Sequence, residues 1–291
     1  MDPERAGNPA HTGPVPAPDA GLPERVRFRN VTKEFGVAGE RRVALQDINF
    51  VVPDNPDRGE LIALIGPSGC GKSTVLRIIA GLKPHFPPTR GEATVFGKPV
   101  EKPGSERGVV DQKYSLLPHL TVLENIAFGL RLRGTPRRER RAAALDWVRK
   151  VGLDGFDDKY PSELSGGMQQ RVAIAATLIL EPKILLMDEP FGALDPKIRL
   201  QMQELLIALW KEQKSTVFIV THSIEEAVYL GDRVFRMVAR PGRLVETLAL
   251  PRPDEPPEIM RKRPWFTSVT QELLRRLEDD APAGGELAHL K

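Results

Sequence analysis

The sequence has very little cysteine and no long apolar run, and both deficits exclude classes of protein. Cys70 is the single cysteine, so no disulfide can form within the chain, as is typical of proteins in a reducing compartment. No stretch approaches the roughly 18 apolar residues that a membrane-spanning helix requires. The N-terminal residues also lack the apolar segment of a secretory signal. We therefore expect a cytosolic chain that does not cross a membrane by itself.

The chain also lacks an excess of one charge. Its 42 lysines and arginines and 39 aspartates and glutamates leave a formal net charge of +3. This balance argues against a nucleic-acid-binding protein, in which basic residues dominate the surface field. Hydrophobic residues make up 41% and charged residues 28% of the 291 residues. This is ordinary globular composition, and it excludes a fully disordered or fibrous chain.

Proline is abundant, with 27 residues, and its distribution suggests where the ordered part begins and ends. Residues 1–23 combine Pro, Ala and Gly with almost no large apolar group, and we expect a disordered tail there. We expect a second disordered tail at 281–291. Between them, 24–250 has the alternating pattern of a folded domain, and 251–280 is typical of a proline-rich linker followed by a helix.

Short apolar runs alternate with helical patterns in the folded part, which predicts an α/β fold with a mostly parallel sheet covered by helices. Residues about 112–180 have helical character almost throughout and predict an inserted helical subdomain. One of its helices is predicted to have Thr135 as N-cap and Pro136 as first residue. The strands predicted from apolar runs are Val43–Val52, Glu60–Ile65, Ile184–Met187 and Thr216–Val220, and the predicted helices include Lys72–Gly81 and Pro196–Gln213.

A glycine-rich loop between a predicted strand and a predicted helix indicates phosphate binding. It matches the pattern G-x-x-x-x-G-K-[ST], in which glycines let backbone amides converge on phosphates at a helix N-terminus. We expect Lys72 to reach the β- and γ-phosphates of a nucleoside triphosphate and Ser73 to offer its hydroxyl to Mg²⁺. The loop consists of Gly66, Pro67, Ser68, Gly69, Cys70, Gly71, Lys72, Ser73 and Thr74.

Two carboxylates follow the apolar run at 184–187. Asp188 is placed to hold Mg²⁺ through its water shell, and Glu189 is placed to polarise an attacking water. With a phosphate loop upstream, this pair indicates triphosphate hydrolysis rather than an acidic surface turn. The N-K-x-D and D-x-x-G elements of guanine-specific GTPases do not occur in the sequence.

A second anion-binding helix start is predicted at Ser165, Gly166 and Gly167, within LSGGMQQR at 164–171. One nucleotide has no need for two such helix ends in the same subunit. Two subunits arranged head to tail would use each end once, with Ser165 and Gly167 closing over a γ-phosphate held by the other subunit.

Together these motifs resemble the ATP-binding cassette family over about 26–250. The resemblance implies a P-loop NTPase (RecA-like) core with an N-terminal antiparallel β part, and ATP and Mg²⁺ as cofactors. It implies that Gln112 senses Mg²⁺ and a transmembrane partner, that His222 contacts the γ-phosphate, and that Asp195 couples the two sites of a dimer. Phe35 matches the aromatic residue that stacks on adenine, although a place in the hydrophobic core is nearly as good an interpretation.

Four segments resemble the nitrate, sulfonate, taurine and bicarbonate importers more narrowly: YSLLPHLTVLEN (114–125), DKYP (158–161), MDEPFGALD (187–195) and ARPGR (239–243). This resemblance implies the ATP-hydrolysing subunit of a bacterial importer for a small anion or organosulfur compound. The implied partners are a second ATPase subunit, transmembrane permease subunits at the inner face of the cell membrane and, indirectly, a substrate-binding protein. An exporter of lipid or lipoprotein type and a soluble non-transport cassette protein are the alternatives.

Two further patterns have less specific interpretations. The basic run Arg131–Arg141 could meet anionic headgroups or a partner's loop, but a solvated helical face is the favoured interpretation. Near the C-terminus an apolar stripe at helical spacing predicts a helix that packs on the core, because about 30 residues are too few for a separate regulatory domain. The stripe consists of Phe266, Val269, Leu273 and Leu277.

Overall fold

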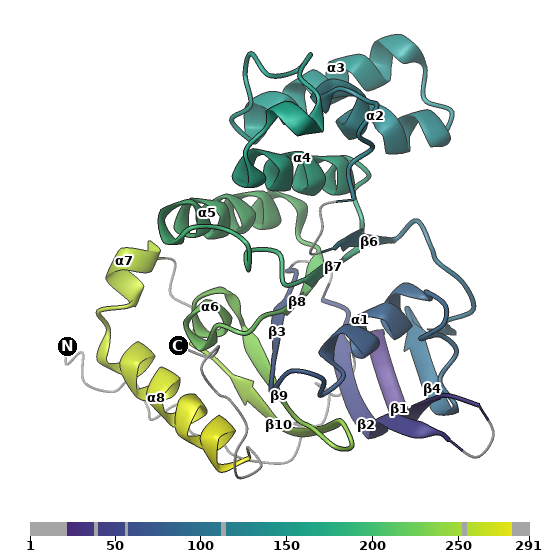
Figure 1. Cartoon of the computed structure of the whole chain (residues 1–291), viewed down its shortest axis with the longest axis vertical. Coiled ribbons are helices and arrows are strands. Elements are labelled where there is room, and N and C mark those ends of the chain that lie inside the picture. Colours follow the sequence, from purple (N-terminus) through teal and green to yellow (C-terminus); the bar gives the residue numbers. More distant parts are fainter. Residues whose placement is uncertain (1–21, 38–39, 56–57, 112–114, 252–254, 281–291) are drawn as a thin grey trace. The chain divides into compact units, whose positions relative to one another are not determined.

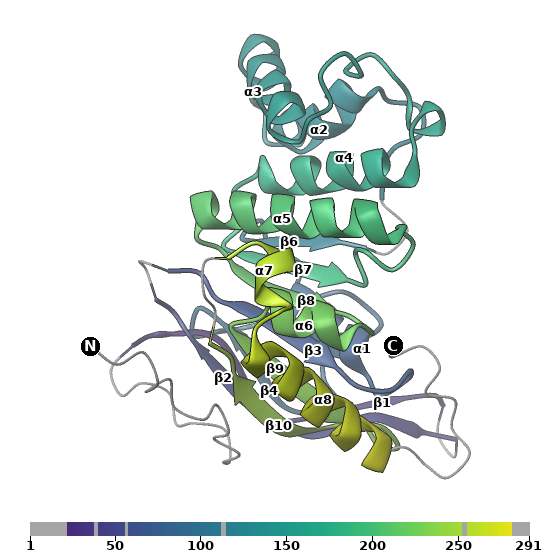
Figure 2. The same cartoon turned by 90° about the vertical axis from the view of Figure 1, so that its left-hand side faces the viewer.

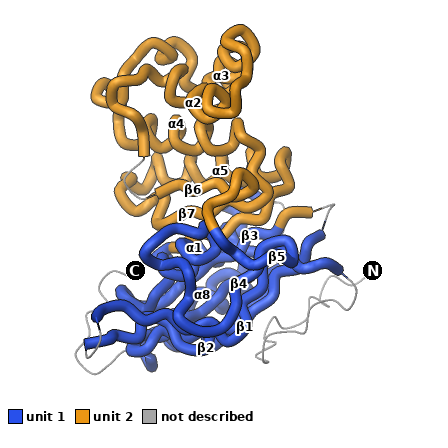
Figure 3. The backbone as a smooth tube through the Cα atoms, turned by 90° about the vertical axis from the view of Figure 1, so that its right-hand side faces the viewer, with its two compact units in different colours: residues 1–56, 60–101, 221–291 blue, residues 57–59, 102–220 orange. Residues whose placement is uncertain are grey.

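The computed structural model describes residues 22–37, 40–55, 58–111, 115–251 and 255–280. Gln112 and the predicted tails, apart from residues 22 and 23, lie outside the described residues. The backbone forms two compact units, which Figure 3 shows in different colours. Unit 1 comprises residues 1–56, 60–101 and 221–291, and unit 2 comprises residues 57–59 and 102–220.

An antiparallel sheet in unit 1 has the strand order β2-β1-β4-β5. β1 and β2 pair along most of their length, and Phe28 of β1 stacks on Phe50 of β2 with ring centroids 4.5 Å apart. Val26 and Val52 are buried beside these rings, so alternate residues of both strands face the core. This sheet is the predicted N-terminal antiparallel part (Figure 1). The strands are β1 (Glu24–Phe35), β2 (Arg42–Pro53), β4 (Arg90–Val95) and β5 (Lys98–Pro99).

A second group of strands in unit 1 leads into the phosphate loop. β3 is buried at every position and pairs in parallel with β9, which pairs antiparallel with β10. The helix α1 follows β3 and ends at Gly81, the predicted C-cap, whose amide bonds to the carbonyl oxygens of Arg77 and Ile78. The elements are β3 (Leu61–Ile65), α1 (Lys72–Ala80), α6 (Ile224–Leu230), β9 (Arg233–Val238) and β10 (Arg243–Ala249).

The chain after β10 forms the short helix α7 (Pro257–Met260) and the longer helix α8 (Pro264–Asp279). The predicted apolar stripe is buried on α8, which packs against α6 and lies beside β10 (Figure 2). Arg236 of β9 and Arg276 of α8 both pair with Glu246 of β10, so ion pairs add to the apolar contact. The stripe therefore packs on the core of unit 1, as predicted.

Three parallel strands form the sheet of unit 2, in the order β8-β7-β6. All five residues of β8 and the first four of β7 are buried, which explains why both sequences are continuous apolar runs. The helix α5 has the predicted bounds and packs against α4. The elements are β6 (Arg107–Val110), β7 (Ile184–Asp188), α5 (Pro196–Gln213) and β8 (Thr216–Val220).

The helices between β6 and β7 form a cluster in which α2 packs on both α3 and α4 (Figures 1 and 2). The sequence predicts Thr135 as the N-cap of α3, and this is wrong by one residue. Pro136 is the N-cap, because its ψ of 145° is extended rather than helical. Among the described residues no helix is long and apolar enough to cross a membrane. The elements are α2 (Val122–Leu132), α3 (Arg137–Lys150), the 3₁₀ helix η1 (Pro161–Glu163) and α4 (Gly166–Leu178).

Candidate nucleotide site

The phosphate loop in unit 1 connects the buried strand β3 to α1. Gly71 is the N-cap of α1 and has φ +96°, a conformation that favours glycine. A Cβ atom at Gly71 would lie 2.4 Å from Cδ2 of Leu45, so the backbone fits here only without a side chain. Gly71 has no side chain that could cap the helix. Backbone amides at a helix N-terminus are the groups that bind phosphate oxygens in such loops.

Lys72 is buried, with 5% of its surface exposed, and its ammonium group lies against the loop's own backbone. Its Nζ donates to the carbonyl oxygen of Gly66 at 2.7 Å and to that of Pro67 at 3.2 Å. Phosphate oxygens carry more charge than carbonyl oxygens and can replace them as stronger partners of the ammonium. Ser73 is half-buried and Thr74 is buried in the first turn of α1. The loop geometry thus fits a triphosphate.

The loop residues differ sharply in exposure. Ser68 and Gly69 are exposed, whereas Cys70 is fully buried. Burial raises the pKa of the Cys70 thiol, and the nearby charge of Lys72, whose Nζ lies 3.9 Å from Sγ, acts in the opposite direction. The thiol is therefore protonated at neutral pH. Ser68 and Gly69 form the part of the loop that an incoming ligand can reach.

Phe35, the predicted adenine-stacking residue, ends β1 in unit 1 and is half-buried. Its ring makes a T-shaped contact with His85, with centroids 5.2 Å apart and an interplanar angle of 73°. The Nζ of Lys33 lies 5.2 Å from the centre of the Phe35 ring. The side chain is thus neither a full core residue nor a free surface residue. Sequence reasoning missed His85, because no local motif marks it.

His222 is held in a short turn that follows Val220. The amide of Thr221 donates to the carbonyl oxygen of Leu64 in β3 at 3.3 Å, and Oγ1 of Thr221 accepts from the amide of Ser223 at 3.0 Å. Oγ of Ser223 in turn accepts from the amide of Glu226 at 3.2 Å and caps α6. These bonds anchor His222 from both sides, and the contact to Leu64 places the turn beside the strand that enters the phosphate loop.

The two predicted hydrolytic carboxylates lie at the end of β7 in unit 2. Asp188 pairs with Val220 of β8, and the amide of Glu189 donates to the carbonyl oxygen of Val220 at 2.9 Å. Glu189 has φ +49°, a conformation that costs a non-glycine residue of order 1 kcal/mol. Such strain persists where surrounding structure enforces it, and it concentrates at functional sites. The backbone at Glu189 therefore agrees with a functional role for this carboxylate.

The second predicted anion-binding helix end belongs to α4 in unit 2. Ser165 is the N-cap, and its Oγ accepts from the amide of Met168 at 3.4 Å. Ser165 and Gly166 are exposed, so this helix end faces solvent within the single chain. A Cβ atom at Gly167 would lie 2.7 Å from Cγ2 of Ile198, so glycine at this position permits the close packing of α4 on α5.

Asp195 has a structural role close to the contact between Gly167 and Ile198. Its Oδ1 accepts from the amides of Lys197 and Ile198, both at 3.1 Å, and caps α5. The cap orients the first turn of α5, which carries the side chain that touches Gly167. Asp195 is therefore tied to the α4 helix end through Ile198, a relationship that the sequence motif alone does not reveal.

The segment before α2 is organised by one buried amide side chain. Oδ1 of Asn125 accepts from the amide of Leu117 at 2.8 Å. Its Nδ2 donates to the carbonyl oxygens of Leu117, Leu120 and Thr121 at 2.9 to 3.1 Å. A reciprocal capping box between Thr121 and Glu124 starts α2. Residues 117–121 thus have a defined shape, which suits a contact surface.

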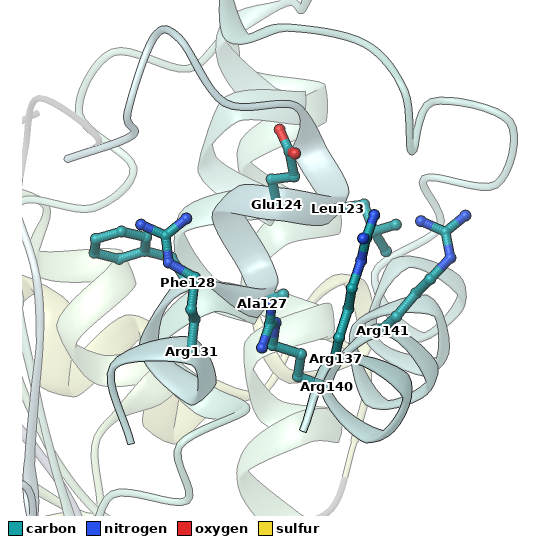
Figure 4. Close-up of a pocket in the computed structure, with 8 residues that line it drawn as sticks. All are labelled: Leu123, Glu124, Ala127, Phe128, Arg131, Arg137, Arg140 and Arg141. Carbon is teal, nitrogen blue, oxygen red and sulfur yellow. The ribbon is translucent and has the colours of Figure 1, made fainter. Parts of the chain in front are cut away.

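A cavity of about 110 Å³ lies between α2 and α3, with arginines standing around an apolar floor (Figure 4). The guanidinium of Arg131 lies 5.3 Å from the centre of the Phe128 ring. None of the lining arginines forms an ion pair with any residue that the structure describes. The basic run is therefore partly a solvated face, as favoured above, and partly the wall of a cavity. The lining residues are Leu123, Glu124, Ala127, Phe128, Arg131, Arg137, Arg140 and Arg141.

Each unit holds a share of the predicted site residues. Unit 1 contains Phe35, the loop at 66–74 and His222. Unit 2 contains the helix end at 165–167, the carboxylates at 188–189, and Asp195. Gln112 lies outside the described residues. The contacts that sequence reasoning missed join positions far apart in the chain, such as Phe35 and His85.

Residues 45–192 match the family model described as ABC transporter. The taurine import ATP-binding protein of Rhizobium johnstonii is 54% identical over 202 residues, which cover 69% of this chain and 74% of that protein. The nitrate import ATP-binding protein of a Synechocystis species is 44% identical over 237 residues, which cover 79% of this chain and 86% of that protein.

Among solved structures, a dimeric post-hydrolysis state of the ATP-binding cassette MJ0796, bound to ADP and Pi, resembles this chain. The two are 35% identical with a TM-score of 0.65, and the match covers 78% of this chain and 99% of that chain. Together with the parallel strand pairs and their helices, this likeness confirms the α/β fold of a P-loop NTPase.

Proposed function

This chain belongs to the ABC transporter family, and from that premise we propose that it is the ATP-hydrolysing subunit of a bacterial importer for a small anion or an organosulfur compound. The observation that carries the proposal is the phosphate loop, in which Gly71 begins α1 without a side-chain cap and the Lys72 ammonium lies against the loop's own carbonyl oxygens. The names of the relatives, which import taurine and nitrate, support the class of cargo.

In this proposal the base and the phosphates of ATP are bound by residues of unit 1, and Mg²⁺ is bound by residues of both units. Phe35 stacks on adenine, and the backbone and side chains of the loop at 66–74 bind the phosphates. Ser73, Asp188 and Gln112 supply hydroxyl, carboxylate and amide oxygens, the hard donors that suit Mg²⁺, which is usually held by few protein ligands plus phosphates. When bound, Mg²⁺ neutralises part of the phosphate charge.

Hydrolysis depends on two further side chains. Glu189 orients and polarises the attacking water from the end of β7, where its backbone has a positive φ. His222 contacts the γ-phosphate from its doubly anchored turn. Both groups act only when the triphosphate is present, so their loss should affect turnover more than binding.

A second subunit completes the site. Ser165, Gly166 and Gly167 of one protomer close over the nucleotide held by the other, and Asp195 couples the two sites through the first turn of α5. The exposure of Ser165 and Gly166 supports this arrangement, because an uncovered helix N-terminus can accept an anionic ligand from outside. The similar solved cassette is dimeric. We propose a head-to-tail dimer.

Permease subunits are the partners that couple this dimer to transport, and they place the chain at the cytoplasmic face of the cell membrane. A substrate-binding protein acts indirectly, through the permease. The shaped segment 117–121 and the arginine cavity between α2 and α3 form the proposed permease contact. The lining guanidinium groups form no ion pair with a described residue, so they favour an acidic loop as the occupant. ATPase subunits of lipid or lipoprotein exporters and soluble non-transport cassette proteins are the competing assignments.

Glu189→Gln tests the hydrolytic assignment. The substitution keeps the shape of the side chain but removes the charge that orients water, so turnover should fall by about 100-fold or more while ATP still binds. The variant should accumulate as an ATP-dependent dimer, measured by size-exclusion chromatography with light scattering. Turnover like that of the wild-type protein would refute the role of Glu189.

Co-purification tests the transport assignment. The chain should purify from detergent extracts with a polytopic membrane protein, whereas a soluble non-transport protein should not.

Arg137→Glu with Arg140→Glu should weaken that association and leave ATP binding intact, because both residues line the cavity. Arg138→Glu is the matched control, since Arg138 lies on the same helix outside the cavity. Equal loss with the control would show that charge alone, not the cavity, explains the effect.

A further inference from the structure

Phe35 contacts a loop that lies outside the motifs assigned to phosphate binding and hydrolysis. Residues 82–89 connect α1 to β4, and this loop brings the ring of His85 against Phe35 in the T-shaped contact described above. Aromatic pairs in this geometry attract each other and restrict ring rotation. One side of the Phe35 ring is therefore held by His85, while the residue as a whole remains partly exposed.

The same loop is tied to the end of β1 by three hydrogen bonds. Nζ of Lys33 donates to the carbonyl oxygen of Pro87 at 2.7 Å. The amide of Thr89 donates to the carbonyl oxygen of Thr32 at 2.8 Å, and Oγ1 of Thr89 accepts from the amide of Glu34 at 2.9 Å. The residues that precede Phe35 thus have a fixed position relative to the loop that carries His85.

His85 is also linked to the helix of the phosphate loop. Nη1 of Arg77, on α1, lies 3.4 Å from Nε2 of His85. A guanidinium group can only donate, so Nε2 is the acceptor and Nδ1 carries the proton. Burial and the charges of Arg77 and Lys33 lower the pKa of His85, which keeps the ring neutral at pH 7, as this bond requires.

As a residue that only filled space, His85 would reduce the stability of the folded protein. Its Nδ1 is buried and has no hydrogen-bond partner among the described residues. A buried donor without an acceptor reduces stability, and an apolar side chain would fill the same space without that penalty. The contacts that His85 does make, to Phe35 on one side and Arg77 on the other, join the base-stacking residue to the helix that begins in the phosphate loop.

We propose that His85 is a positioning residue that holds the Phe35 ring for stacking on the adenine of ATP. The inference rests on the proposed function, in which Phe35 stacks on the base and the loop at 66–74 binds the phosphates. His85 itself does not touch the phosphates. Its effect is therefore confined to the part of the binding free energy that comes from the base.

The test measures binding of two probes to the full-length chain, ATP and inorganic tripolyphosphate, which has the phosphates but no base. His85→Ala should raise the Kd for ATP about three- to tenfold, as expected from the loss of one aromatic contact, and leave the Kd for tripolyphosphate unchanged. The kcat at saturating ATP should also be unchanged. Lys83→Ala is the control, because Lys83 is an exposed residue of the same loop.

Two further variants separate ring contact from packing. His85→Phe keeps an aromatic ring and should retain ATP affinity, whereas His85→Leu fills space without a ring and should behave like His85→Ala. Adding Phe35→Ala to His85→Ala should produce no loss beyond that of Phe35→Ala alone, because both act through one stack. Equal affinities of the Phe and Leu variants, or a parallel loss of tripolyphosphate binding, would overturn the proposal.

Phe35→Ala alone distinguishes failure of this inference from failure of its premise. If Phe35→Ala weakens ATP binding and His85→Ala does not, the role of His85 is wrong and the base-stacking role of Phe35 stands. If Phe35→Ala leaves the Kd for ATP unchanged, the stacking assignment itself is wrong, and the role of His85 falls with it.

Discussion

The helices α1 and α4 both begin at glycine-containing loops, but their N-termini differ in what covers them. At α1 the N-cap is Gly71, and the adjacent Lys72 and Cys70 are buried within the loop. At α4 the N-cap is Ser165, whose hydroxyl bonds the helix amide of Met168, and Ser165 is exposed together with Gly166. The first helix end is enclosed by its own loop, and the second faces outward.

This difference indicates that the two helix ends have different functions in one cassette. An enclosed loop with a buried lysine can bind a triphosphate with residues of a single chain. An exposed helix end offers an anion site for a ligand that is bound to the surface of another subunit. The comparison therefore predicts that α1 controls nucleotide affinity and that α4 controls hydrolysis in the dimer.

The largest expected effects separate these two roles. Ser165→Arg fills the exposed helix end with a long side chain, so ATPase activity should fall by about 100-fold or more while ATP affinity of the subunit changes little. Lys72→Ala removes a charge-assisted contact to the phosphates, so ATP affinity itself should fall, by about tenfold or more. Nucleotide binding by calorimetry and steady-state hydrolysis measure the two effects.

A crosslink checks that the two helix ends of different chains meet. Ser68→Cys and Ser165→Cys, in a Cys70→Ala background, should join two chains only when ATP is present. The variant with Ser68→Cys alone is the control. Crosslinks within one chain, or none under conditions that support turnover, would contradict the head-to-tail arrangement.

An intermediate effect concerns thiol reactivity within the enclosed loop. Cys70 is buried and its pKa is raised, so its thiolate fraction at pH 7.5 is below that of an ordinary thiol and its reaction with a maleimide should be slow. Ser68→Cys in a Cys70→Ala background is exposed and should react at least about tenfold faster. The Cys70 rate should rise as pH increases toward the raised pKa.

Complete labelling at Cys70 should abolish ATP binding, and MgATP should protect the thiol. A Cys70 rate as fast as that of the exposed thiol would mean that the loop is open in solution. Mass spectrometry of the labelled chain over time gives both rates.

The smallest expected effect tests the packing behind α4. A methyl group at Gly167 would meet Ile198, so Gly167→Ala should destabilise the protein by about 1–3 kcal/mol in urea unfolding. Gly166→Ala is the matched control, because a Cβ atom there has open space around it, and its effect should stay within about 0.5 kcal/mol. Equal effects of the two substitutions would show that contact with Ile198 does not constrain this helix end.

Local patterns predicted a large part of this fold. The buried strands β3, β7 and β8 are continuous apolar runs, and α5 has its predicted bounds between a capping aspartate and Gln213. Where the prediction for α3 is wrong, Pro136 follows a threonine that could itself cap a helix, and only the backbone angles decide between the two. Such errors of one residue are typical at helix ends, where several residues can serve as the cap.

The sequence by itself determined the motifs on which the proposed chemistry depends, because each motif needs only neighbouring residues: a glycine-rich loop at a helix start, a strand that ends in two carboxylates, and a serine that caps a glycine-rich helix start. Only the tertiary structure decided which distant residues support these motifs. His85 meets Phe35 across 50 positions, and Ile198 meets Gly167 across 31, as the residue numbers show. Contacts at such separations depend on how strands and helices pack, and no local pattern records that packing.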